Sequence, residues 1–217
     1  MGNEHKLSTV GPLAFLENPD AVELFAKIDY QLKDGFHFQD RGNQRPYFFF
    51  IEQNEQSLTA YYDKFFGVIL SHGGEGMDRY YYLEFNGTDR GGIDGDHRCF
   101  MKAEYVIVGF LIYKIIYIDR YFDLNSIKKL QAIIKTDYEE LTKDIYRLLA
   151  KLRKTNPTTF GGGKLDDVIE DALREFKKLG WVLIEEDFFD VMPSFQRMNK
   201  VYSDYINNVE QMIKDAI

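Results

Sequence analysis

Apolar residues recur at intervals of three and four along much of this chain, a spacing that places them on one face of a helix. This pattern, or apolar character on every side, predicts helices at 20–33, 57–71, 101–118, 125–135, 137–153, 164–179 and 194–217. The stretch 101–118 is the one that is apolar all round, so we expect it to be buried in a core. The helix at 125–135 has Asn125 or Ser126 as its N-cap.

The same periodicity indicates which side of each helix is buried. In the first helix, which ends before Gly35, the apolar face consists of Val22, Phe25, Ile28 and Leu32. In the second helix it consists of Leu58, Tyr61, Tyr62, Phe65 and Ile69. The stripe of 137–153 is formed by Tyr138, Leu141, Ile145, Leu148, Leu149 and Leu152. The helix at 164–179, which Gly180 stops, buries Leu165, Val168, Ile169, Ala172, Leu173, Phe176 and Leu179.

Short aromatic and apolar runs predict strands at 46–51, 80–85, 181–184 and 188–191. The last two are joined by three acidic residues and form a β-hairpin. The glycine-rich, acidic stretch 86–97 is typical of an exposed loop or a mobile hairpin tip near a domain boundary.

The second half of the chain therefore runs helix, linker, helix and hairpin, which is the order of a winged helix. The linker contains Asn156, Pro157 and three glycines at 161–163. We expect an α+β, mostly helical protein with tandem winged-helix domains and short β-hairpin wings. The predicted domains are 10–98, which is winged-helix-like, and 99–217, which adds a terminal helix.

Composition narrows the setting in which the protein works. Cys99 is the only cysteine, so an intramolecular disulfide and a cysteine-rich zinc site are excluded. No apolar run follows Met1, and the most apolar stretch, 105–118, is too short to cross a bilayer. We therefore expect a cytoplasmic protein with no membrane partner. A net charge of −8 and a pI near 5.1 make it a poor DNA binder on its own.

Catalytic patterns are weak, so we expect no enzyme, no catalytic or metal-binding residues and no cofactor. Asp94, Asp96 and His97 are the strongest candidates, since a carboxylate–histidine group can hold a metal ion. Their spacing matches no metal-binding pattern, and a polar surface loop explains them more simply. A metal-dependent enzyme that uses these three residues stays open as a third hypothesis.

Basic residues are concentrated in one part of this acidic chain. Between 127 and 154 eight basic residues face four acidic ones, which suits contact with phosphates as well as it suits an ordinary charged helix surface. The candidate DNA contacts from this stretch and the helix after it are Arg147, Lys151, Arg153, Lys154, Lys164, Arg174, Lys177 and Lys178.

Several segments resemble the MukE/MksE family, the kite subunits of bacterial condensins. The run 24–37, with Leu32, Gly35 and His37, resembles the family's opening helix and turn, and 58–83 its next helix and strand. The stretch 101–123 is similar to its central helix, and 164–182 followed by 189–197 is similar to its closing winged helix. The aromatic strand and the turn Leu179–Gly180–Trp181 resemble MksE more than MukE, whereas the glycine-rich 86–97 loop departs from the pattern.

The resemblance implies a tandem winged-helix homodimer that hydrolyses nothing and binds a kleisin subunit. Through the kleisin it would join an SMC-type coiled-coil ATPase that acts on DNA at the nucleoid, in chromosome condensation and segregation or in plasmid defence. On this hypothesis Phe25, Ile28 and Tyr61 are candidates for dimer or kleisin contact, although each also fits a core position. The alternative is a free-standing winged-helix transcription regulator that binds DNA through Arg174, Lys177 and Lys178.

Overall fold

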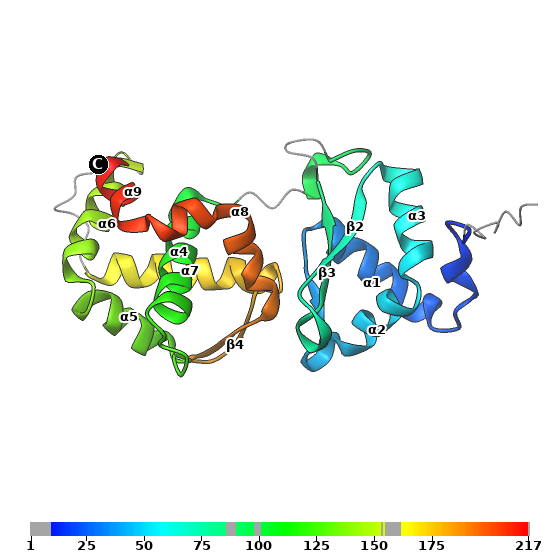
Figure 1. Cartoon of the computed structure of the whole chain (residues 1–217), viewed down its shortest axis with the longest axis horizontal. Coiled ribbons are helices and arrows are strands. Elements are labelled where there is room, and N and C mark those ends of the chain that lie inside the picture. The colour runs from blue at the N-terminus through cyan, green and yellow to red at the C-terminus, as the bar shows by residue number, and fades with distance from the viewer. Residues whose placement is uncertain (1–9, 86–89, 98–100, 153, 155–161, 217) are drawn as a thin grey trace, which may run out of the picture. The chain divides into compact units, whose positions relative to one another are not determined.

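The structure is a computed structural model that describes residues 10–85, 90–97, 101–152, 154 and 162–216. It is mostly helical with two small antiparallel sheets, as expected for an α+β chain (Figure 1). The chain divides into two compact units, unit 1 (residues 1–99) and unit 2 (residues 100–217). Each unit has its own hydrophobic core and is described by itself below.

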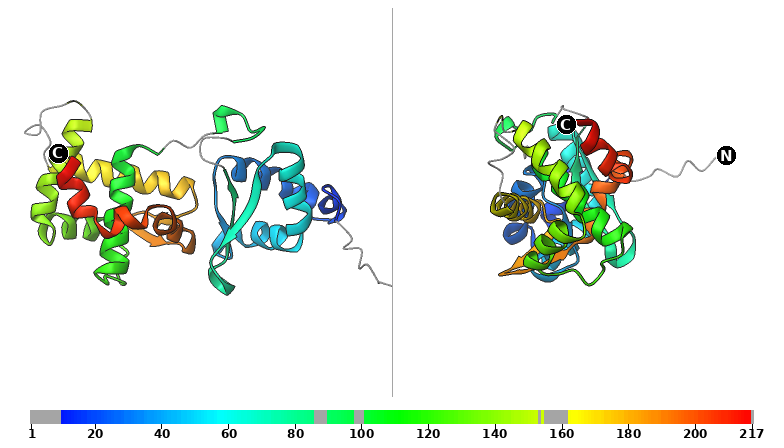
Figure 2. Two further views of the ribbon diagram at one scale, coloured as in Figure 1. Left: turned by 45° about the horizontal axis from the view of Figure 1, so that its top comes forward. Right: turned by 90° about the vertical axis from the view of Figure 1, so that its left-hand side faces the viewer.

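Unit 1 places three helices against one face of a three-stranded sheet (Figure 2). Its helices are α1 (Ala21–Lys33), α2 (Arg45–Gln53) and α3 (Glu55–Phe66), with single 3-10 turns at η1 (Ala14–Glu17), η2 (Gly42–Gln44), η3 (Gly76–Asp78) and η4 (Gly95–His97). Its strands are β1 (Phe38–Gln39), β2 (Ile69–Gly73) and β3 (Tyr80–Glu84).

The sheet of unit 1 has the order β1-β3-β2, and both pairings are antiparallel. Phe38 lies opposite Tyr81, and Leu70 lies opposite Leu83. Because side chains alternate along a strand, these four residues point into the same core as Ile28 and the other buried residues of α1 to α3. The predicted strand at 80–85 is confirmed.

The predicted strand at 46–51 is wrong, because this run lies in helix α2. Pro46 occupies the first turn of the helix, where its missing N–H has no consequence and its fixed φ favours helical geometry. Phe48 and Ile51 point into the core while Phe49 is more exposed, a spacing of three that fits a helix. A short apolar run does not distinguish a buried strand from a buried helix by periodicity.

Two details of the first predicted helices also differ. The helix predicted over 57–71 ends at Phe66, because Gly67 has a φ of 64° and terminates it in a left-handed conformation. Ile69 therefore lies in β2, not on the helix face. Val22, predicted to be in the core, is 96% exposed, since the buried face of α1 begins at Ala21 and continues through Ile28.

Unit 2 is built around two crossing helices. Its helices are α4 (Ala103–Tyr113), α5 (Ile127–Thr136), α6 (Glu139–Leu152), α7 (Gly162–Lys178), α8 (Gln196–Asn207) and α9 (Val209–Ala216), with a π-helical turn η5 (Lys114–Ile118) and a 3-10 turn η7 (Pro193–Phe195). Its strands are β4 (Val182–Glu185) and β5 (Phe188–Val191). The last predicted helix is therefore divided, and α8 is kinked at Tyr202.

Helix α7 runs through the middle of unit 2 and α4 crosses it (Figure 1). The predicted buried face of α7 is confirmed, since Leu165 through Phe176 of that set are 0% exposed. The apolar stretch of α4 is buried as expected. None of the described helices is both long enough and apolar enough to cross a membrane.

The hairpin β4–β5 is antiparallel, as predicted, and is joined by backbone bonds to the start of α5. The Ile127 amide donates to the Asp187 carbonyl at 2.8 Å, and the Phe189 amide donates to the Asn125 carbonyl at 2.8 Å. Ser126 is the N-cap of α5, since its hydroxyl accepts the Lys129 amide at 3.2 Å. The Ser126 hydroxyl also donates to the Asp187 carboxylate at 2.8 Å, so the N-cap of α5 is bonded to the turn of the hairpin.

Candidate interaction surfaces

The basic residues predicted to contact DNA lie on the surface of unit 2, but several carry a carboxylate partner. Arg147 pairs with Asp144 at 3.1 Å on the same helix. Lys151 and Lys154, at the end of α6, and Lys164, in the first turn of α7, are exposed. Arg153 lies outside the described residues.

The charge on the exposed side of α7 changes from negative to positive along the helix. Its first half carries Asp166, Asp167, Glu170 and Asp171, and its last turns carry Arg174, Lys177 and Lys178. This order complements the helix dipole.

The cations in this second half of α7 bond to groups within unit 2. Arg174 bonds to Asp171 at 2.7 Å and to Glu170 at 3.1 Å. Lys178 bonds to Glu175 at 2.7 Å, and Lys177 donates to the Ile184 carbonyl at 3.1 Å. A phosphate that approaches Arg174 must compete with these carboxylates, and one that approaches the first half of α7 also meets Asp166 and Asp167.

In unit 1 the structure brings two of the three predicted contact residues together in an aromatic cluster. The rings of Phe15, Phe25 and Tyr61 lie 4.4 to 5.5 Å apart, measured between centroids. Phe65 extends the cluster to the surface, 5.3 Å from Tyr61. Ile28 is 0% exposed and belongs to the core, so a partner of the folded unit has access to the edge of the cluster and not to Ile28.

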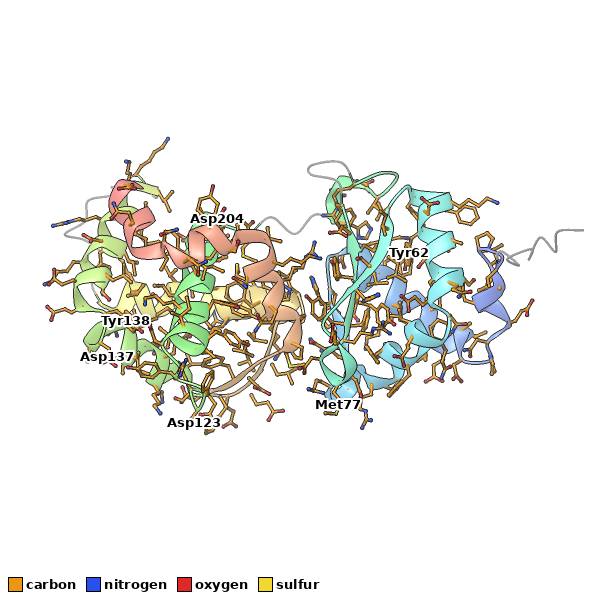
Figure 3. All side chains as sticks on the ribbon, in the orientation of Figure 1. Tyr62, Met77, Asp123, Asp137, Tyr138 and Asp204 are labelled. Atoms are coloured by element: carbon orange, nitrogen blue, oxygen red, sulfur yellow. The ribbon has the colours of Figure 1, made fainter. Side chains whose placement is uncertain are left out.

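A polar bridge lies beneath this cluster. The Tyr62 hydroxyl, which points from α3 toward α1 (Figure 3), donates to the Asp29 carboxylate at 3.2 Å. Lys33 bonds to the other oxygen of Asp29 at 2.6 Å. Burial, and after it the Asp29 charge, raises the pKa of Tyr62 well above its usual value and raises that of Tyr61 as well. Both hydroxyls therefore stay protonated at neutral pH, and the bridge joins α1 to α3.

The loop that holds Asp94, Asp96 and His97 packs against unit 1 over its described part, residues 90–97. The Gly92 amide donates to the Phe66 carbonyl at 2.7 Å, and Arg90 donates to the Lys33 carbonyl at 2.7 Å. A Cβ at Gly91 would lie 1.9 Å from the Phe66 carbonyl oxygen, so this approach requires glycine. Most of residues 91–96 are exposed, as predicted for a surface loop near a domain boundary, and these bonds join the loop to α1 and to the end of α3.

The three candidate metal ligands do not converge. The His97 ring bonds to Asp34 at 2.7 Å, whereas Asp94 accepts the Asp96 amide at 3.2 Å within the loop. Among the described residues no group of three or more His, Cys, Asp or Glu side chains is arranged to hold a metal ion. His97 instead ties the loop to the end of α1.

Unit 2 has an apolar groove between α4, α6 and α8 that the sequence patterns did not reveal. Its volume is about 380 Å³, and it is lined by Ala103, Val106, Ile107, Phe110, Leu148, Leu152, Tyr202 and Tyr205. Leu152 was predicted to face the core, but it lies on the groove and is 45% exposed. The sequence signal was present as the last position of the α6 stripe, where the apolar pattern continues to the end of the helix.

Comparison with known families identifies one match. The family described as condensin complex protein MksE matches residues 23–202, which include most of both units. Among curated proteins no significant match is found.

Proposed function

Because this chain belongs to the MksE family of condensin complex proteins, we propose that it is the non-catalytic accessory (kite) subunit of a bacterial condensin. It binds a kleisin and, through it, helps an SMC-type coiled-coil ATPase to engage DNA at the nucleoid in the cytoplasm. The complex serves chromosome condensation and segregation or plasmid defence. The observation that carries this proposal is the family match, which extends over both units.

We propose that both units are winged helices, within the predicted domains 10–98 and 99–217. In unit 1 the order α1, β1, α2, α3, β2, β3 and the sheet order β1-β3-β2 support this, with β2–β3 as the wing. In unit 2 the β4–β5 hairpin follows α7, and the bonds from residues 125 and 127 to the hairpin provide the equivalent of the first strand.

The charge distribution supports DNA engagement through the complex more than through this subunit alone. A winged-helix regulator reads bases with the N-terminal part of its recognition helix. Here that part of α7 carries four carboxylates. Nonspecific affinity for DNA comes from the release of counterions by basic residues, and most of the described cations on α7 bond to groups of this chain.

The homodimer and part of the kleisin contact are proposed to use the surface edge of the aromatic cluster, at Phe25, Tyr61 and Phe65. Exposed aromatic residues over a rigid, well-packed base are typical centres of protein interfaces. Ile28 supports this surface from below and does not itself meet a partner.

Co-expression with the kleisin from the same operon tests the proposal. The tagged protein should co-elute with the kleisin at physiological salt, and with the SMC ATPase when all three are expressed. Specific DNA binding by this protein alone, without co-elution of the kleisin, would replace the condensin proposal with the transcription regulator. In that case reversing the charges of Arg174, Lys177 and Lys178 should abolish the binding.

A further inference from the structure

Residues 90–97, the last described segment of unit 1, bond to the ends of two of its helices. Arg90 donates to the carbonyl of Lys33, the last residue of α1, at 2.7 Å. The Gly92 amide donates to the carbonyl of Phe66, the last residue of α3, also at 2.7 Å. The last carbonyls of a helix have no partner within that helix. The segment therefore provides bonds to both helix ends, and we call it the clasp.

Three side chains of the clasp add to these bonds. The Arg90 guanidinium lies 3.9 Å from the centroid of the Phe85 ring. Ile93 is 6% exposed and belongs to the core of unit 1. The His97 ring bonds to Asp34, the C-cap of α1, at 2.7 Å. The clasp is thus attached at its start, at its middle and at its end.

Two adjacent glycines of the clasp differ in what a methyl group would do. Gly91 has a φ of 57°, and its added Cβ would lie 1.9 Å from the Phe66 carbonyl oxygen, so both its conformation and its surroundings require glycine. A Cβ on Gly92 would lie 3.6 Å from its nearest atom, the Phe65 carbonyl oxygen, which is an ordinary contact. Alanine at position 91 should therefore release the clasp, whereas alanine at position 92 should not.

The clasp is weakly held compared with the strand that precedes it. Five of its eight residues are exposed, and Ile93 is its one buried side chain. Strand β3 instead pairs with a strand on either side and buries the residues from Tyr80 to Leu83. Segments with few buried apolar contacts open at a lower free energy than the core. The clasp should therefore open while the rest of unit 1 stays folded.

The state of the clasp changes the length of chain that connects the two units. With the clasp closed, five residues, 98–102, separate His97 from Ala103, the first residue of α4. With the clasp open, seventeen residues, 86–102, separate Phe85 from Ala103. Flexible chains of these two lengths have root-mean-square end-to-end distances of about 12 Å and about 23 Å.

We propose that residues 90–97 are a releasable clasp that sets the reach between unit 1 and unit 2. In the closed state the clasp is bound to the ends of α1 and α3, and the connecting chain is short. In the open state unit 1 keeps its fold, and residues 86–97 are added to the connection. Within an assembly, the longer connection lets each unit keep its own contacts while the other moves.

Hydrogen exchange of the residue 92 amide, measured by NMR on the full chain, tests whether the clasp opens. In the wild type its protection factor should be at least about a hundredfold lower than those of the β3 amides, because the clasp opens without the core. Gly91→Ala should lower it by a further tenfold or so, and the matched control Gly92→Ala should stay within about twofold of the wild type. Equal protection of residue 92 and β3 in the wild type would overturn the proposal, because the segment would then open only with the core.

Single-molecule FRET on the full chain tests whether the clasp sets the reach. The dyes are attached at Met77→Cys in unit 1 and Phe122→Cys in unit 2, whose native side chains are 78% and 67% exposed, and Cys99→Ser removes the native thiol. Gly91→Ala should widen the distribution of distances by up to about 10 Å relative to Gly92→Ala. Faster exchange with an unchanged distribution would refute the proposal, since the clasp would then open without lengthening the connection.

A second variant covers the case in which Gly91→Ala disturbs the fold of unit 1. His97→Ala removes only the bond to Asp34 and should shift both readouts in the same direction by a smaller amount. Thermal unfolding, monitored by circular dichroism, shows whether each variant is folded. A folded His97→Ala variant that matches the wild type in both readouts would exclude His97 from the clasp, and the same result for folded Gly91→Ala would exclude the clasp itself.

Discussion

The crossing of α4 with α7 and α8 leaves little room for an added methyl group. Gly109 lies inside α4, and a Cβ at this position would be 2.5 Å from the Met198 Cε of α8 and 3.1 Å from the Phe176 Cζ of α7. Carbon atoms pack at about 3.5–4.0 Å, so Gly109→Ala requires the methionine to move by about 1 Å. Met198 is on the helix that carries Tyr202 and Tyr205, so this change should also disturb the groove.

Two effects of opposite sign set the change in the free energy of unfolding caused by Gly109→Ala. Replacing glycine by alanine inside a helix stabilises a protein by up to about 1 kcal/mol. Overpacking a tight core costs about 1–3 kcal/mol, here toward the lower end because the methionine side chain is flexible. Gly163→Ala in α7 is the control, since Gly163 has no atom within 4 Å of its added Cβ and only the favourable effect applies.

Urea unfolding, followed by tryptophan fluorescence, measures both variants. Trp181 is the only tryptophan. It is buried in the core of unit 2, with its ring centroid 5.8 Å from that of Phe176, so it reports this unit. We expect Gly109→Ala to be less stable than Gly163→Ala by about 1–3 kcal/mol. Equal free energies of unfolding for the two variants would refute the close crossing.

Three further predictions concern unit 2. Ser126→Ala should lower the free energy of unfolding by about 1 kcal/mol, because the Lys129 amide loses its cap, and the same fluorescence assay would contradict this with an unchanged midpoint. Leu173→Ala should lower the free energy of unfolding by about 2–5 kcal/mol, because Leu173 is 0% exposed and its truncation leaves a cavity. A smaller loss would mean that neighbouring side chains move in to fill the cavity. Burial and the bond to Asp119 raise the pKa of Tyr138. The folded chain then keeps a proton that the unfolded chain releases, so this stabilisation is present below the usual tyrosine pKa and is lost as the pH rises. Tyr138→Phe should therefore lose less stability than the wild type between about pH 9 and pH 11, and an identical loss in the two proteins would exclude this cause.

Local chemistry was sufficient to predict most helices of unit 2 and the hairpin. The buried face of α7, its stop at Gly180 and the Ser126 cap depend on residues within a few positions of one another. Such signals are readable from sequence because helix periodicity, capping and turns are set by neighbouring residues. The family resemblance, which the match over residues 23–202 confirms, rests on the same elements.

Tertiary contacts decided the features that the local pattern left ambiguous. The run 46–51 could bury apolar side chains either as a strand or as a helix. In the structure it is a helix, and its buried residues pack in the core of unit 1. The loop at 90–97 contains glycines and acids typical of an exposed segment, yet its bonds to Phe66 and Lys33, distant in sequence, hold it in place.

The sequence by itself determined the class of the protein, the order of most elements and the distribution of charge along the chain. It could not reveal that Asp166 of α7 bonds to Lys135 of α5, or that Leu152 and Tyr205, more than 50 residues apart, line one groove. Periodicity states which face of a helix is apolar but not what covers it. Whether an apolar position becomes core or binding surface depends on where the other helices end, and only the packed structure decides that.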